Sequence, residues 1–204
     1  MSFQCCAQEP EFDGLSSAFK RALWAVIAIN GVMFLVEMGA GVVAGSQALK
    51  ADALDFLGDT ATYAISLAVI GMPLIWRSRA ALFKGLSLGA MGFWVLGLTA
   101  YQLLGPGVPR AEVMGAITLL ALVANLTSVL LLLKFRNGDA NVRSVWLCSR
   151  NDAIGNVAVM AAAGGVWSSQ TAWPDLAVAA IMAGLFLWSS VQIVRHARRE
   201  MSPA

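Results

Sequence analysis

The chain has 204 residues, of which 58% are hydrophobic and 13% charged, and its mean hydropathy is +0.70. This composition is too apolar for a soluble domain and is typical of an integral membrane protein. The net charge of +2 gives no indication of nucleic-acid binding.

Residues 1–18 form the expected cytoplasmic N-terminal tail. The tail carries Glu9, Glu11 and Asp13 but lacks a basic segment followed by an apolar core, so we do not expect a cleavable signal peptide. Cys5 and Cys6 are adjacent and could bind a soft metal, carry a lipid or simply be exposed. Together with Cys148 they make no disulfide framework.

Six apolar stretches follow the tail, and together they would fill the rest of the chain at about 20 residues per span. Each is expected to be a helix, because a spanning segment must satisfy its backbone hydrogen bonds internally. The runs are too long and too uniformly apolar for the short alternating strands of a β-barrel. The predicted spans are Ala22–Gly45, Asp52–Trp76, Leu82–Leu104, Glu112–Leu133, Val145–Val166 and Leu176–Val194. The sequence thus predicts an all-α membrane protein, a six-transmembrane-helix bundle in residues 19–197 with a short cytoplasmic tail at 198–204.

The first span contains Glu37, which we expect either to hydrogen-bond to a site residue or to carry protons. It also contains Gly41-x-x-x-Gly45, and the third span contains Gly85-x-x-x-Gly89. Both are small-xxx-small patterns, which allow helices to approach closely.

The second span contains Asp55 and Asp59, spaced i,i+4 and therefore on one helical face. Ionisable groups inside a membrane are costly and usually mark the path of a substrate or an ion. Asp55 is also compatible with an interfacial position near the outer end. Asp52, which opens the span, is expected to be a helix-start residue.

The fifth span repeats this spacing with Cys148 and Asp152. Two such faces could form a four-ligand metal site. The structural alternative is that Asp59 and Asp152 bond to Asn125 or to a hydroxyl on another helix, and that Cys148 is a small buried hydrophobic residue. Asn30, Asn125 and Asn156 are expected to hydrogen-bond between helices.

Basic residues flank the spans unequally. The connections that follow the first, third and fifth spans hold only Lys50 and Arg110. The tails and the other connections hold Lys20, Arg21, Arg77, Arg79, Lys84, Lys134, Arg136, Arg143, Arg195, Arg198 and Arg199. Because basic residues concentrate on the cytoplasmic side, both termini are expected in the cytoplasm.

Three runs carry a more specific pattern. They are Asn30-x-x-x-Phe34-x-x-Glu37 with Gly41 and Gly45-Ser46-Gln47-Ala48-Leu49; Ala51-Asp52-Ala53-x-Asp55-x-x-x-Asp59; and Asn141-Val142-Arg143-Ser144-x-x-x-Cys148-x-x-x-Asp152-x-x-Gly155-Asn156. In this order they resemble the first, second and fifth spans of the cation diffusion facilitator (cation efflux) family, whose members export divalent transition metals in exchange for protons.

The resemblance implies a metal site of Asp55, Asp59, Cys148 and Asp152, a homodimer, a bacterial inner-membrane location and no enzymatic activity or prosthetic group. Two departures stand out: Cys148 occupies the position of a histidine that is usual in the family, and the family's cytoplasmic C-terminal domain is not expected here, since the chain ends ten residues after Val194.

The donor atoms indicate which metal this site would prefer. Three carboxylates and a thiolate suit Zn²⁺, and the sulfur favours softer ions such as Cd²⁺, whereas Mg²⁺ and Ca²⁺ prefer oxygen ligands only. Metal would displace protons from these groups, as a proton-coupled exporter requires. There are three alternatives to a metal exporter. The first is a membrane subunit that senses metal without transporting it. The second is a channel, although a channel needs a polar lining through the bilayer and the polar residues here concentrate at one or two depths. The third is an enzyme resembling the CDP-alcohol phosphotransferases, although the Asp-Gly and Arg that begin that enzyme motif are missing before Asp52.

Overall fold

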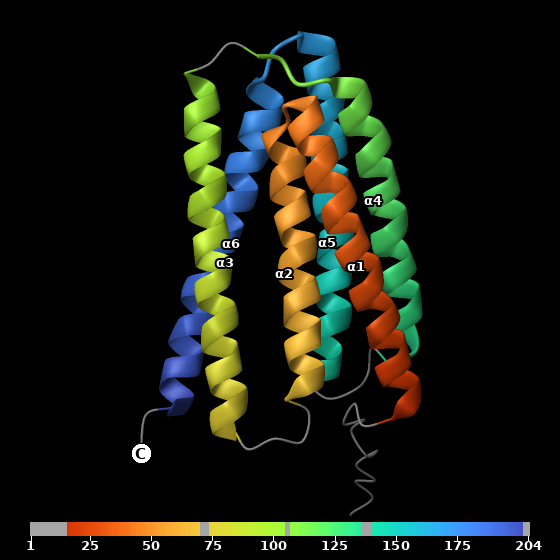
Figure 1. Cartoon of the computed structure of the whole chain (residues 1–204), viewed down its shortest axis with the longest axis vertical. Helices are drawn as coiled ribbons and strands as arrows, with labels where there is room; N and C mark the ends of the chain where they lie inside the picture. The colour runs from red at the N-terminus through yellow and green to blue at the C-terminus, as the bar shows by residue number, and fades with distance from the viewer. Residues whose placement is uncertain (1–15, 70–73, 105–106, 136–139, 202–204) are drawn as a thin grey trace, which may run out of the picture.

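The structure, a computed structural model, describes residues 16–69, 74–104, 107–135 and 140–201, and within these ranges it leaves out the side chains at 74, 77, 140–148, 151, 196 and 200. Cys5, Cys6 and the side chain of Cys148 therefore lie outside the described part. The elements are α1 (Ser17–Ala44), α2 (Gln47–Ala68), α3 (Leu74–Leu103), α4 (Ala111–Leu132), the 3₁₀ helix η1 (Leu133–Phe135), α5 (Ala140–Ser169) and α6 (Trp173–Met201) (Figure 1).

The predicted all-α fold is confirmed, but the second span was misplaced. It was expected at Asp52–Trp76, whereas α2 begins at Gln47 and ends at Ala68. Trp76 belongs to the first turn of α3. Continuous apolarity across residues 64–76 hid the boundary from hydropathy, which does not detect where the chain turns.

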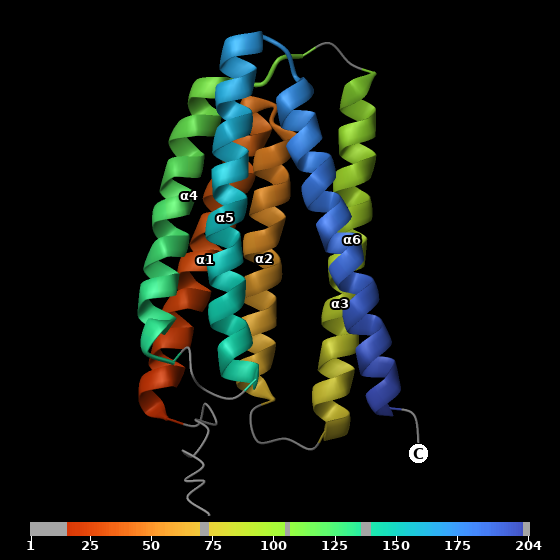
Figure 2. The same ribbon diagram turned by 180° about the vertical axis from the view of Figure 1, so that it is seen from behind.

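The six helices form two groups. Helices α1, α2, α4 and α5 pack together, while α3 packs more extensively on α6 than any other two helices pack on each other. Figures 1 and 2, seen from opposite sides, both show α3 and α6 side by side and apart from the other helices at the lower end, where α1 begins and α6 ends. The α3–α6 pair contacts the four-helix group through α2 and α5.

Large apolar side chains lie on the outside of the bundle and polar ones inside it. Trp24, Leu35, Phe93, Leu104 and Trp188 are all exposed, and the polar residues Asn30, Glu37, Asp52, Asn125 and Asn156 are all buried. A soluble protein would show the reverse, so the protein is an integral membrane protein.

Hydropathy and length alone support a membrane span for α1, α3, α4 and α6. Helix α2 falls short because it holds Lys50, Asp52, Asp55 and Asp59 within 22 residues. Helix α5, which carries Asp152, also falls short within its described part. Among the described residues, the two helices that fall short are those that bear the predicted ligands.

The α1–α2 turn is only two residues long. Gly45 ends α1 in a left-handed conformation (φ 69°), and the backbone N–H of Ser46 donates to the carbonyl of Gly41 at 3.0 Å. Ser46 then caps α2, because its Oγ accepts from the Leu49 N–H at 3.0 Å. The prediction that Asp52 starts the helix was therefore wrong: Asp52 lies one turn further on and is buried.

The glycine patterns have different roles. A Cβ on Gly41 would lie 2.9 Å from Lys50 Cγ, so Gly41 permits the close approach of α1 and α2 as predicted. A Cβ on Gly45 would meet no atom within 4 Å, so Gly45 serves the turn instead. On α3, a Cβ on Gly85 would lie 2.9 Å from Val194, and one on Gly89 would lie 2.7 Å from Ser190 Oγ. The predicted close packing through Gly85 and Gly89 is thus confirmed, with α6 as the partner.

The upper end of the bundle is tied to the α1–α2 turn by residues from other helices. Asp175, near the start of α6, accepts hydrogen bonds from Ser46 Oγ (2.5 Å) and from the backbone N–H groups of Gln47 (2.8 Å) and Ala48 (3.1 Å). Gln102 Nε2 of α3 donates to the Gly45 carbonyl at 2.8 Å. These bonds join the α3–α6 pair to α2 at one end of the molecule.

Candidate metal centre

Three of the four predicted ligands lie together inside the bundle. Asp55 and Asp59 project from α2, Asp152 projects from α5, and all three line one small, closely packed pocket. Asp152 lies within hydrogen-bonding reach of both Asp55 and Asp59. The i,i+4 spacing therefore places Asp55 and Asp59 on the side of α2 that meets α5.

The fourth predicted ligand, Cys148, has no described side chain, although its backbone lies in α5 one turn before Asp152. No three Asp, Glu, His or Cys side chains in the described part of the chain are arranged to hold one metal ion together. Binding would therefore require the three carboxylates to turn from one another toward the ion.

Asp52 is a member of the pocket that sequence reasoning did not place there. It lines the same space as Asp55 and Asp59, together with Phe56 and Asn30. The spacing of three residues between Asp52 and Asp55 puts them on neighbouring parts of one helical face. That signal was available in the sequence, but the expected helix start obscured it.

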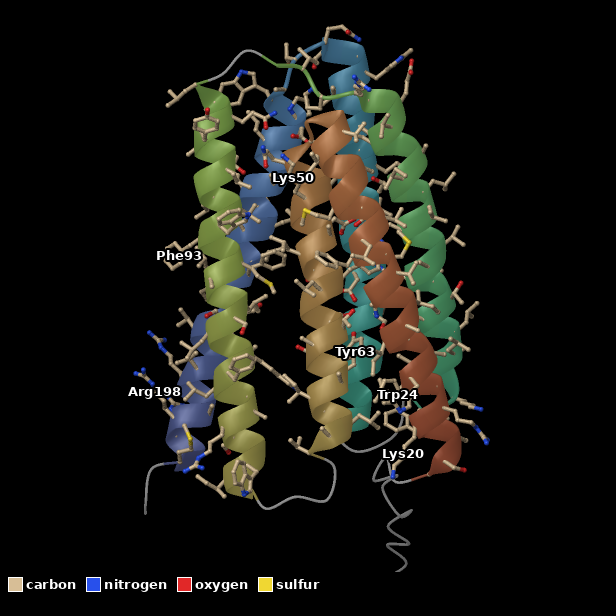
Figure 3. All side chains as sticks on the ribbon, viewed as in Figure 1. Lys20, Trp24, Lys50, Tyr63, Phe93 and Arg198 are labelled. Atoms are coloured by element: carbon tan, nitrogen blue, oxygen red, sulfur yellow. The ribbon has the colours of Figure 1, made fainter. Side chains whose placement is uncertain are left out.

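Tyr63 is a second residue that sequence reasoning missed. Its hydroxyl donates to Asp59 Oδ2, and it lies 3.4 Å from Ser149 Oγ on α5. The ring is fully buried in an apolar cluster with Phe19, Leu23 and other residues toward the lower end (Figure 3). The signal was again periodicity, because residues 55, 59 and 63 continue one i,i+4 row.

A chain of hydrogen bonds joins three helices at the pocket, and two of its residues, Asp52 and Asn125, line the pocket. The amide of Asn156 on α5 is oriented so that it bonds to both of its neighbours. Its nitrogen donates to the two carboxylate oxygens of Asp52 at 3.2 and 2.6 Å, and its oxygen accepts from Asn125 Nδ2 of α4 at 2.7 Å. The prediction that Asn125 and Asn156 bond between helices is confirmed. For Asn30, Nδ2 has no hydrogen-bond partner within the described part of the chain.

Glu37 completes the polar interior from the side of α1. Its side chain is fully buried and lies against Asp52. The electrostatic effect of Asp52 on Glu37 is larger than the effect of Asp55. Neither of its two oxygens makes a hydrogen bond of good geometry in the described part of the chain. Arg150 of α5 is exposed.

Comparison with known proteins identifies the family of this bundle. The profile of the cation efflux transmembrane domain matches residues 76–202, which is more than half of the chain. The chain belongs to the cation efflux family. The resemblance seen in the motifs is thereby confirmed.

Two curated relatives in the cation efflux family extend the match toward the N-terminus. They are the metal cation efflux system protein CzcD of Cupriavidus metallidurans and the cation efflux system protein CzcD of Alcaligenes sp. (strain CT14). Each is 28% identical in an alignment 180 residues long, which covers 82% of this chain and 57% of the relative. The chain therefore spans little more than half of the length of these relatives.

The aligned segment includes all three described carboxylates of the predicted site. About 37 residues (18% of 204) lie outside the aligned segment. More residues than this precede Asp55, and more than this follow Asp152, so the segment contains both positions wherever it begins. The similarity to these cation efflux proteins thus extends to α2 as well as to the region matched by the family profile.

Proposed function

We propose that this cation efflux protein carries divalent transition-metal ions, Zn²⁺ or Cd²⁺, across the membrane and exchanges them for protons. The ion would bind to Asp55, Asp59, Cys148 and Asp152. The observation that carries the proposal is the shared pocket of Asp55, Asp59 and Asp152, since three carboxylates from two helices inside a membrane bundle have no evident structural use.

The proposed donor set explains both binding and exchange. A divalent ion would replace the contacts that Asp152 makes with Asp55 and Asp59, and would favour the ionised state of every ligand. Protons held by these groups would leave as the ion binds and would return as the ion leaves. Metal and protons would thus be exchanged because they compete for the same oxygen atoms. A thiolate at Cys148 would raise the preference for Cd²⁺ over ions that prefer oxygen.

The proposed direction is efflux from the cytoplasm of a bacterium through its inner membrane. The basic residues support it, because Lys20 and Arg198 lie at the lower end of the bundle and Lys50 lies near the upper end (Figure 3). By the positive-inside rule the lower end, with both termini, faces the cytoplasm. The working unit is proposed to be a homodimer.

The decisive experiment is metal uptake by the purified protein in liposomes, with a panel of metals and an internal pH dye. Asp59→Asn and Asp152→Asn should each lower the uptake rate by at least about a hundredfold, because loss of a charged ligand removes several kcal/mol of binding. Glu112→Gln, at an exposed acid in the first turn of α4, is the control and should transport normally. Wild-type uptake by either Asn variant would contradict the site.

The same assay separates the other functions. Uptake only after a second protein is added would favour a sensing subunit, and uptake that moves no protons would exclude exchange.

The fourth ligand is tested by Cys148→Ser. The substitution should weaken Cd²⁺ binding by about tenfold more than Zn²⁺ binding, because it replaces a soft sulfur by a hard oxygen. Isothermal titration of both metals measures the ratio of affinities, with Cys5→Ser and Cys6→Ser present in both the parent and the variant so that the tail supplies no thiolate. An unchanged ratio would exclude Cys148 from the site.

A further inference from the structure

Glu37 and Asp52 form a pair of buried carboxyl groups that the proposed metal site does not use. Glu37 is 0% exposed and Asp52 is 2% exposed. An isolated carboxylate in such a place would be far more costly than a neutral polar group, so it must be neutralised or paired. The charged group that acts most strongly on Glu37 is another acid, Asp52, which cannot provide a balancing charge.

The two acids differ in their hydrogen bonds. Asp52 receives two from the amide of Asn156, which is itself held by Asn125. Glu37 receives none in the described part of the chain, and both of its oxygens are enclosed. This asymmetry suits a Glu37 hydroxyl that donates to Asp52, with the two asparagines holding the acceptor in place.

Among the residues whose side chains the structure describes, no charged group offers Glu37 an alternative partner. Helices α2 and α4 pack on α1. The charged groups of α2 that interact electrostatically with Glu37 are Asp52 and Asp55, and both are acids. The sole charged residue of α4 is Glu112, which lies in its exposed first turn. Around α2, Asp152 of α5 faces the predicted ligands, Lys84 of α3 bonds to Ser66, and Asp175 of α6 caps the helix. Lys50 acts on Asp175 instead.

We propose that Glu37 and Asp52 form a proton-binding site, and that the proton held between them is exchanged for the metal. The inference rests on the proposed function, because it names where a transported counter-ion is held. The pair is not part of the proposed ligand set, but Asp52 lines the same pocket as Asp55, Asp59 and Asp152.

Because Asp52 lines the pocket of the proposed metal ligands, metal binding and proton binding would be coupled. When a divalent ion enters the pocket, its charge stabilises the ionised state of both carboxyl groups. The O–H bond of Glu37 then breaks, the proton passes to water, and Glu37 and Asp52 remain as two anions beside the ion. When the metal leaves, one proton returns and the bond to Asp52 forms again.

Infrared difference spectroscopy tests the proton directly. At neutral pH without metal, wild type minus Glu37→Gln should show the carbonyl stretch of a protonated carboxyl group, which shifts in D₂O. Wild type minus Glu112→Gln, an exposed acid on α4, should show no such band. Absence of the band from the first difference, with circular dichroism and gel filtration unchanged by the substitution, would overturn the proposal.

Asp52→Asn supplies a second test of the pair. Because it changes the acceptor, the Glu37 carbonyl stretch should shift in this variant, and an unshifted band would show that the proton is not shared with Asp52. Loss of the wild-type band when Na⁺ replaces choline in the buffer would show a metal cation between the acids, and would also overturn the proposal.

Coupling is measured by proton release on Zn²⁺ binding in detergent. Glu37→Gln should release about one proton fewer per metal than wild type, with a Zn²⁺ site still present. The infrared band requires no transport. A missing band in a protein that transports would overturn this inference alone. A clear band in a protein that moves no metal would contradict the proposed function and the exchange that rests on it, and would leave only the protonated pair.

Discussion

Tyr63 shows how one uncharged residue can set the direction of a buried carboxylate. Its hydroxyl bonds to Asp59, and its ring is held by apolar side chains of α1 and α4 such as Leu23 and Leu132. A residue that orients a ligand in this way commonly changes metal affinity by about 10- to 100-fold when it is lost. Tyr63 is thus a positioning residue for the proposed site.

Tyr63→Phe should weaken metal binding about tenfold, because Asp59 loses its hydrogen bond while the packing of the ring is kept. Titration calorimetry should show the higher Kd, and liposome uptake should show a higher KM with a smaller change in kcat. Tyr101→Phe is the control, since Tyr101 is 78% exposed. Equal affinities in wild type and Tyr63→Phe would mean that the bond does not position Asp59.

At the scale of elements, α3 and α6 behave as one packed pair. Gly85, Gly89 and Gly92 bring the two backbones together, and Ser190 Oγ donates to the Gly85 carbonyl at 2.6 Å. Because a lipid environment gives helices no hydrophobic incentive to associate, such close packing and interhelical hydrogen bonds hold the pair.

Gly92→Ala should lower the free energy of unfolding by about 1–2 kcal/mol, because the new methyl group would lie 2.9 Å from Leu187 Cγ and 3.2 Å from the Ala183 carbonyl oxygen. Gly97→Ala is a matched control on the same helix, with no atom within 4 Å of the added group. It should be neutral or slightly stabilising, since alanine favours helix. Unfolding in mixed detergent micelles measures both, and equal stabilities would contradict close packing at Gly92.

For the whole molecule, the hydrogen bonds at the upper end determine how the two groups of helices are joined. Asp175 of α6 satisfies two N–H groups that every helix start leaves without an intrahelical partner, here those of Gln47 and Ala48. An acid at this position also interacts favourably with the dipole of α2. The α3–α6 pair is therefore anchored to the helix that carries Asp55 and Asp59.

Asp175→Asn should speed amide hydrogen exchange at Gln47 and Ala48 by about tenfold or more, since a charged acceptor of three bonds is replaced by a neutral one. Exchange in the middle of α4, which Asp175 does not contact, should be unchanged. Ser169→Ala is the control, at an exposed hydroxyl of α5 that bonds only locally. Equal protection of the α2 start in wild type and Asp175→Asn would show that other bonds suffice to hold it.

Local spacing and apolarity were enough to predict the helices and the face that Asp55 and Asp59 share on α2. The apolar runs predict six helices because a membrane leaves the backbone no other way to satisfy its hydrogen bonds. The i,i+4 pairs depend only on the helical repeat within one segment, so the shared face of Asp55 and Asp59 followed from the sequence. Gly85 and Gly89 indicated close packing for the same reason.

Only the tertiary structure decided which faces meet. The hydrogen bonds of Asp52 with Asn156, of Asn156 with Asn125 and of Asp175 with the start of α2 join residues far apart in the chain. They depend on the rotation and axial register of whole helices, which are determined by packing summed over many side chains and leave no periodic signal at one residue. For that reason the sequence placed Asp52 at a helix start, whereas the fold places it in the same pocket as Asp55 and Asp59.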